Sequence, residues 1–141
     1  MSIQPGTYMI HPASDEGQGA GIGPVPLMFP PPPVPLRILP THIMEPFTLK
    51  PQDGNTYQLT AQRESWSVVP KDEYVFLHAR DLPGPSHSWS VQPSGSGTYR
   101  VQLPNNDQVW TFFKDDMPQV QLKPANGSQE QNWKFVRIER D

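Results

Sequence analysis

Residues 97–101 read Gly97-Thr98-Tyr99-Arg100-Val101, and this short pattern occurs three times in the chain. The same order of a turn residue, Thr, Tyr, any residue and an aliphatic residue begins at Gly6 and at Asn55. An aromatic residue lies ten positions before the Tyr of the second and third copies, at Phe47 and Trp89. A repeat of about 40 to 50 residues is typical of chains built from copies of one supersecondary unit. The sequence therefore predicts three similar units.

The composition favours short strands and turns over helices. The 141 residues include 19 Pro and 10 Gly, and hydrophobic residues make up 35%. A chain of this length buries roughly two-thirds of its unfolded surface, so we expect one domain with a real core. No long segment has apolar positions at helical spacing with caps, so we expect no helix of any length. The absence of Cys excludes disulfides and thiolate metal sites.

Short alternating segments give each unit four expected strands. In the second unit residues 66–69 alternate and residues 74–77 form a short apolar run, and in the first unit Leu36 and Ile38 share one face of a strand over 34–39. Residues 11–19 read instead as turn and loop. Twelve short strands in three alike units predict an all-β fold, the β-trefoil, in which a barrel of two strands per unit is capped by the remaining hairpins. We expect a single domain over 1–141, with repeats of approximately 1–50, 51–92 and 93–141.

Charge and hydropathy exclude two classes of partner. The net charge is −3 and no cluster of Lys and Arg is present, so nucleic acid is not an expected partner. No run of 18 apolar residues occurs, and the N-terminus lacks a basic region followed by an apolar one, so we expect neither a membrane span nor a signal peptide. These features predict a soluble, cytoplasmic protein.

The polar residues form no recognisable catalytic pattern. The four His residues are His11, His42, His78 and His87. They have neither a pairing at i, i+4 nor a carboxylate at metal-ligand spacing, so no metal site is expected. Adjacent carboxylates at Asp115 and Asp116 are typical of a solvated turn. The run from Gly17 to Gly23 lacks the strand-to-helix context of a phosphate loop. We therefore expect no enzyme activity and no cofactor.

Several segments resemble one family of inhibitors. They are residues 5–10, 35–40, 118–122 and 133–138. With the repeat pattern and the cysteine-free composition, they resemble the mushroom β-trefoil serine protease inhibitors called mycospins, the family of cospin and cnispin. The resemblance covers the whole chain at the level of the repeat pattern. It implies a stable, cytosolic fungal monomer whose partner is a trypsin-, chymotrypsin- or subtilisin-like serine protease.

The resemblance also implies a protease-binding loop, which the family carries either between the second and third strands of the first unit or late in the third unit. The first position corresponds here to Leu27, Met28, Phe29, Pro30 and Pro31. Large apolar side chains suit a hydrophobic specificity pocket, as in chymotrypsin-like targets, and the prolines behind them would stiffen the loop. A stiff loop avoids the ordering cost of a flexible peptide on binding.

Two basic residues are second choices for the reactive position, because trypsin-directed members present Arg or Lys. Lys123 is expected at the start of the loop over 124–132 in the third unit and would favour trypsin. Arg37 is the basic residue nearest to the first-unit loop, but it falls inside the predicted third strand.

Two alternatives share the β-trefoil fold. Gln131-Asn132-Trp133 matches the Gln-x-Trp pattern of ricin-type lectin repeats, and a lectin would bind glycans through exposed aromatic side chains near Trp110 and Trp133. A cysteine protease inhibitor of the mycocypin type would carry Gly-rich loops in the first unit, as 17–23 allows.

A third alternative is a proline-rich docking ligand. Residues 32–37 match the P-x-x-P-x-R pattern read by SH3 domains, and residues 29–33 match the pattern read by EVH1 domains. Leu36 is needed in the core, which disfavours docking of the first match.

Overall fold

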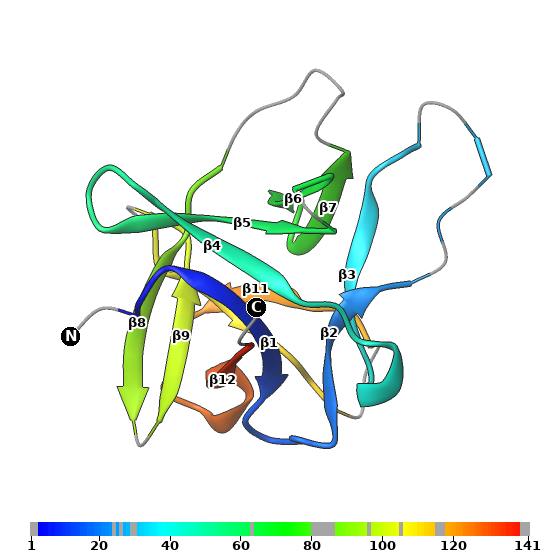
Figure 1. Ribbon diagram of the computed structural model, residues 1–141. Helices are drawn as coiled ribbons and strands as arrows, with labels where there is room; N and C mark the ends of the chain where they lie inside the picture. The colour runs from blue at the N-terminus through cyan, green and yellow to red at the C-terminus, as the bar shows by residue number, and fades with distance from the viewer. Residues whose placement is uncertain are drawn as a thin grey trace.

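The computed structural model describes residues 3–23, 25, 27–28, 31–62, 64–79, 87–95, 97–104, 106–114 and 118–138. Within these residues the chain forms twelve strands and two short 3-10 helices, so the predicted all-β class is confirmed (Figure 1). The strands are β1 (Gly6–Pro12), β2 (Gln18–Ile22), β3 (Val34–Pro40), β4 (Phe47–Gln52), β5 (Thr56–Ala61), β6 (Trp66–Lys71), β7 (Tyr74–Ala79), β8 (Ser90–Gly95), β9 (Thr98–Gln102), β10 (Gln108–Thr111), β11 (Gln121–Pro124) and β12 (Trp133–Arg137). The 3-10 helices are η1 (Thr41–Ile43) and η2 (Gln129–Gln131). Neither helix has the length needed to cross a membrane, and the described part of the chain has no other helix that could.

Six of the strands close into a ring. β1 pairs with β12 on one side and with β4 on the other, β4 pairs with β5, and β9 joins β8 to β12. The bridge between Tyr57 and Trp89 links β5 to the start of β8 and completes the circuit. A closed ring leaves no free edge with unpaired backbone groups, which stabilises the sheet and removes a site for aggregation.

The other six strands form three hairpins, β2–β3, β6–β7 and β10–β11, which are also joined to one another. Val34 of β3 pairs with Leu77 of β7, and Gln121 of β11 pairs with Tyr74 of β7. A bridge between Arg37 and Gln119 joins β3 to the residues just before β11. Each hairpin is therefore held by both of its neighbours.

The aromatic residues that mark the repeats in the sequence form the centre of the core. Trp89, Trp110 and Trp133 are fully buried, and the centroids of both Trp89 and Trp133 lie 5.6 Å from that of Trp110 in edge-to-face contacts. The indole Nε1 of Trp89 donates to the carbonyl of Val68 at 2.9 Å, and that of Trp133 donates to the carbonyl of Trp110 at 3.1 Å. Phe47, at the matching place in the first unit, is equally buried. Edge-to-face ring pairs add about 0.5–1.5 kcal/mol beyond the area that they bury.

Strand β2 corrects one prediction. Residues 11–19 read as turn and loop, but β2 begins at Gln18 and pairs with β3 over five positions, from Gln18 opposite Pro40 to Ile22 opposite Leu36. The strand is hidden in the sequence because small residues replace the usual apolar alternation. A Cβ on Gly19 would lie 2.6 Å from the Sδ of Met44, and one on Gly21 would lie 3.2 Å from the Cα of Met44. The close approach of Met44 to the backbone of β2 therefore explains why the strand contains glycines.

Candidate functional site

The loop between β2 and β3 covers residues 23–33, and the sheet holds its two ends. On the outgoing side β2 ends at Ile22, which pairs with Leu36. On the returning side Val34 and Pro35 also pair with Leu77 and Phe76 of β7, so β3 lies between two neighbours. The two ends of the loop are therefore ordered before it meets a partner, so ordering them adds nothing to the cost of binding.

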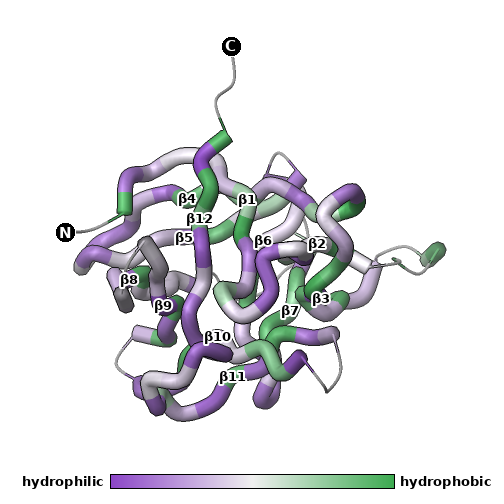
Figure 2. The backbone as a smooth tube through the Cα atoms, turned by 90° about the horizontal axis from the view of Figure 1, so that it is seen from below, coloured by the Kyte–Doolittle hydropathy of each residue, from purple (hydrophilic) through white to green (hydrophobic). Residues whose placement is uncertain are grey.

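Apolar side chains in this loop are exposed to solvent. Leu27 is 105% exposed, Met28 is 61% exposed and Val25 is 36% exposed. Among the described residues, these are three of the six exposed large hydrophobic side chains. Figure 2 shows the corresponding hydrophobic segment standing away from the body of the molecule at the right. Exposed apolar side chains gathered in one place are typical of an interaction site, whereas single ones need no explanation.

Three of the five residues predicted for the binding loop, Leu27, Met28 and Pro31, are described in the structure. Leu27 and Met28 are displayed at the surface, and Phe29 and Pro30 lie outside the described residues. Pro31 is half-buried, as are the two prolines that follow it. Because proline fixes its φ angle, this return to β3 has few alternative conformations. Val25 was not among the predicted residues, although its apolar character and its place two residues before Leu27 were visible in the sequence.

Arg37 lies on β3, opposite Gly21, and its side chain packs against the start of the loop. A Cβ on Gly23 would lie 2.6 Å from both the Cδ and the Nε of Arg37, so the arginine side chain crosses this glycine closely. Arg37 therefore contacts the stem of the loop and is not at its tip.

Lys123 lies within β11, where it pairs with Val109, and not in the loop that follows. The loop itself is fixed by the buried Gln131, whose Oε1 accepts from the amide of Asn126 at 2.8 Å. The Nε2 of Gln131 donates to the carbonyl of Pro124 at 2.9 Å. The predicted start of this loop is therefore corrected, because Lys123 is a half-buried strand residue.

The two tryptophans that mark the predicted sugar site are not exposed. Trp110 and Trp133 both have a relative exposure of 0% and pack against each other in the core. A ring must present a face to solvent to stack on a sugar. Neither tryptophan can therefore stack on a sugar, because the hydrophobic core needs both rings, whereas Phe113, three positions after Trp110, is 36% exposed.

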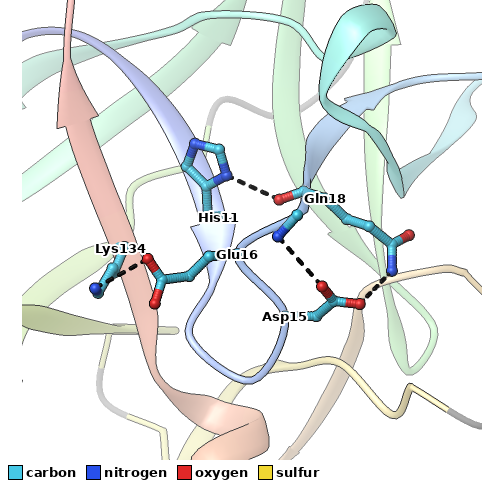
Figure 3. Close-up of polar contacts among 6 residues, drawn as sticks. His11, Asp15, Glu16, Gln18 and Lys134 are labelled. Carbon is cyan, nitrogen blue, oxygen red and sulfur yellow. Dashed lines mark hydrogen bonds and ion pairs between the residues drawn. The ribbon is translucent and has the colours of Figure 1, made fainter.

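A polar cluster holds the turn between β1 and β2 (Figure 3). The Nδ1 of His11 donates to the carbonyl of Gln18 at 2.8 Å. The carboxylate of Asp15 accepts from the Nε2 of Gln18 at 2.7 Å and from the amide of Gly17 at 3.2 Å. The bond from Gln18, supported by the Gly17 amide and Lys114, lowers the pKa of Asp15 against the opposing effect of desolvation.

The contacts in this cluster indicate a structural role. Glu16 forms an ion pair with Lys134 at 3.0 Å, which ties the turn to β12. Across the described ranges, no three His, Asp or Glu side chains gather as a metal site would require. The cluster therefore fixes the entry to β2, the strand that leads to the exposed loop.

Solved structures with the same fold include both inhibitors and lectins. A proteinase inhibitor from Coprinopsis cinerea matches with a TM-score of 0.78 at 19% identity, covering 97% of this chain and 100% of the other. The Rhizoctonia solani agglutinin has a TM-score of 0.74 at 15% identity, covering 98% and 99% of the two chains. The ricin B-like lectin of Macrolepiota procera, solved with lactose, has a TM-score of 0.71 at 15% identity, covering 98% and 100%. At these identities the likeness shows the fold alone.

The sequence itself gives the family. No curated protein sequence matches the chain. The family described as peptidase inhibitor I66 matches residues 1–137, which is nearly the whole chain. Together with the inhibitor structure above, this match confirms the resemblance to the mycospins. The chain therefore belongs to the peptidase inhibitor I66 family.

Proposed function

We propose that this chain inhibits a serine protease by inserting the β2–β3 loop into the active-site cleft. The observation that carries the proposal is the full exposure of Leu27 beside the exposed Met28, at the tip of a loop whose two ends are fixed by strands. The family accounts for peptidase inhibition and hence for a protease as the partner. The serine class and the loop are inferred from the apolar tip and from the resemblance to the mycospins.

The fold that we propose for this scaffold is the β-trefoil, with repeats of approximately 1–50, 51–92 and 93–141. Three observations support it: the closed ring of six strands, the three hairpins that are joined in turn, and the matching bonds of Trp89 and Trp133. In such a fold the hairpin loops vary freely, while the ring keeps their ends in place.

The physical basis of inhibition is a loop that resembles a substrate but is already ordered. A flexible peptide loses about 0.5–1.5 kcal/mol for each side chain that becomes fixed on binding. Here the strand pairs at Ile22 and Val34 fix the two ends of the loop in advance, and the described prolines over 31–33 restrict its return to β3. The loop can therefore bind tightly through a few central side chains.

The specificity that we propose is for chymotrypsin- or subtilisin-like proteases. Leu27 and Met28 provide apolar side chains for a hydrophobic pocket. Arg37 packs at the stem and Lys123 belongs to β11, so neither basic residue occupies the tip. Trypsin, which requires a basic side chain, is then a poor target.

The test is an inhibition assay with variants of the tip. We expect the wild-type chain to inhibit chymotrypsin or subtilisin more strongly than trypsin or papain. Leu27→Gly combined with Met28→Gly should weaken inhibition by about a hundredfold or more, because central anchors in such interfaces contribute about 2 kcal/mol or more each. Ile43→Gly is the matched control, since Ile43 is 50% exposed on η1. Equal inhibition by the double variant and the wild type would exclude this loop, and inhibition of papain alone would favour the cysteine protease alternative.

A further inference from the structure

A small polar hollow lies on the closed ring of strands, away from the β2–β3 loop. It is lined by Gly54 and Thr56 at the β4–β5 turn, by Ser90 and Gln92 of β8, and by residues 102–104 at the end of β9. Figure 1 and Figure 2 both show β8 and β9 at the left of the molecule and β2 and β3 toward the right. The hollow has a volume of about 180 Å³. An engineered cavity of about 150 Å³ holds a benzene molecule, so the hollow has room for one six-membered ring.

Strand pairing holds the walls of the polar hollow in place. The bridge between Tyr57 and Trp89 brings the start of β5 against the start of β8, and Ser90 pairs with Gln102 of β9. Val91, the next residue on β8, is buried in the core. Because side chains alternate between the two faces of a strand, the side chains of Ser90 and Gln92 lie on the outer face of the ring. The hollow therefore opens to solvent on a rigid support.

Two comparable places on the ring are closed by ion pairs. Strand β12 pairs with β1, and Lys134 of β12 forms an ion pair with Glu16 in the turn after β1. Strand β4 pairs with β5, and Lys50 of β4 forms an ion pair with Glu64 in the turn after β5. Strand β8 pairs with β9 in the same way, but β8 contains no charged residue. At this third place a hollow without charges lies where the other two carry a bridge.

The lining of the polar hollow suits a ligand with many hydroxyl groups and no charge. Thr56 and Ser90 supply hydroxyl groups, and Gln92 and Gln102 supply amides. Leu103 and the proline after it supply apolar surface. A charged ligand would find no opposite charge in this lining, and an apolar ligand would cover polar groups without bonding them. A sugar ring has hydroxyl groups along its edge and C–H groups on its faces, so it matches both parts.

The carbonyl oxygens of the two glutamines are available to such a ligand. The Nε2 of Gln92 donates to the Oγ of Ser90 at 2.8 Å, and the Nε2 of Gln102 donates to the carbonyl of Asn106. No described residue donates to the Oε1 of either glutamine. Gln92 is exposed, and the Oε1 of Gln102 is not among the buried polar atoms that lack a partner, so both oxygens reach solvent. The bonds from Nε2 orient the two side chains before a ligand arrives, which lowers the cost of binding.

We infer that the polar hollow binds one neutral sugar ring, such as the terminal hexose or N-acetylhexosamine of a glycan. Hydroxyl groups of the sugar donate to the Oε1 atoms of Gln92 and Gln102, and a C–H face of the ring lies against Leu103. The described lining offers no aromatic ring for stacking, so binding of a single sugar is weak, in the millimolar range. The inference goes beyond the proposed function, because this site needs neither the β2–β3 loop nor a protease.

An NMR titration of the glutamine side-chain amides tests the site. The probes are the methyl glycosides of glucose, galactose and mannose, and N-acetylglucosamine. We expect at least one of them to shift the signals of Gln92 and Gln102 in a saturable way, while the signals of Gln129, exposed on η2, stay in place. Absence of a saturable shift with all four probes would overturn the inference. Equal shifts with glycerol would overturn the sugar class, because glycerol has hydroxyl groups but no ring.

Variants of the lining test the same contact by affinity. Gln92→Leu removes one acceptor at an exposed position and should fold normally. We expect it to weaken binding of the best sugar about fivefold or more, as for one lost hydrogen bond. Ser90→Leu places a larger side chain in the hollow and should abolish binding, with unfolding curves as the check on its fold. Gln129→Leu is the matched control and should bind as the wild type does. Unchanged binding by Gln92→Leu and by a folded Ser90→Leu would overturn the inference.

Inhibition assays separate this site from the protease-binding loop. We expect Gln92→Leu to inhibit the protease as the wild type does, and the double variant of Leu27 and Met28 to bind the sugar as the wild type does. A wild type that binds the sugar but inhibits no serine protease would overturn the proposed function and support this inference. Loss of sugar binding in the Leu27 and Met28 variant, with its fold intact, would overturn the placement of the sugar in the polar hollow.

Discussion

Replacing Trp133 by Phe tests whether the repeated aromatic positions stabilise the core as the structure indicates. The substitution removes three buried ring atoms and the bond from Nε1 to the carbonyl of Trp110, which is 3.1 Å long. Two of these atoms are carbons, and at about 0.8 kcal/mol each they contribute about 2 kcal/mol. The carbonyl left without this donor adds about 1 kcal/mol. The expected loss in the free energy of unfolding is therefore about 3 kcal/mol, a large part of the stability of one domain.

The assay is equilibrium unfolding in urea, with the slope compared between variants to confirm a two-state transition. Trp89→Phe is the internal comparison, because Trp89 is equally buried and donates to Val68 at 2.9 Å. The two variants should lose similar stability. Phe113→Leu, at a side chain that is 36% exposed, is the surface control. A loss below about 1 kcal/mol for Trp133→Phe, or very different losses for the two tryptophans, would refute the reasoning.

Two further predictions concern pH and the hidden strand. Burial lowers the pKa of His87 in the folded chain. As the pH falls through about 6.5, the unfolded chain therefore takes up a proton that the folded chain does not. The free energy of unfolding should therefore fall between pH 7.5 and pH 5.5, and His87→Gln should reduce this fall; an unchanged pH profile would contradict the prediction. Gly21→Ala should destabilise the chain by about 1–3 kcal/mol in urea unfolding, because its Cβ would lie 3.0 Å from the Cδ1 of Leu39 and 3.2 Å from the Cα of Met44. Gly17→Ala, whose Cβ would make an ordinary contact, is the matched control, and equal stability of the two variants would count against close packing on β2.

The sequence predicts the parts of the fold that local patterns encode. The Tyr and Trp positions recur with the units, and the structure places Tyr8, Tyr57, Trp89 and Trp133 in the buried core. The alternation on 66–69 and the apolar run over 74–77 correspond to β6 and β7. These signals are visible because each strand has its own apolar face.

Other features depend on contacts between distant residues. Strand β2 has almost no apolar pattern, because Met44 packs so closely against Gly19 and Gly21 that a larger side chain would clash there. The burial of Trp110, which lies outside the recurring pattern, could not be predicted, because an aromatic residue in a strand suits either a core or an exposed surface. Lys123 lies in β11 since Pro124 still pairs with Gln108 there, although proline usually indicates a loop.

The exposed part of the candidate site was predictable from the residue types of its segment alone. Leu27 and Met28 stand between prolines, which prevent a central strand, and the structure leaves both side chains exposed. By contrast, a hollow of about 180 Å³ beside the loop, lined by Pro33, Lys71 and His87 among others, was not predictable, because these residues come from segments far apart in the sequence.

The most direct test of the central claim is an NMR titration that follows the methyl groups of Leu27 and Met28 as protease is added. We expect both methyl signals to shift with chymotrypsin or subtilisin, and to stay in place when the cleft of the same enzyme is blocked beforehand by a covalent inhibitor. The methyl signals of Ile43 serve as the reference for an exposed side chain outside the loop. Inhibition without a shift of the Leu27 and Met28 signals, or equal shifts with the blocked enzyme, would contradict insertion of this loop into the cleft.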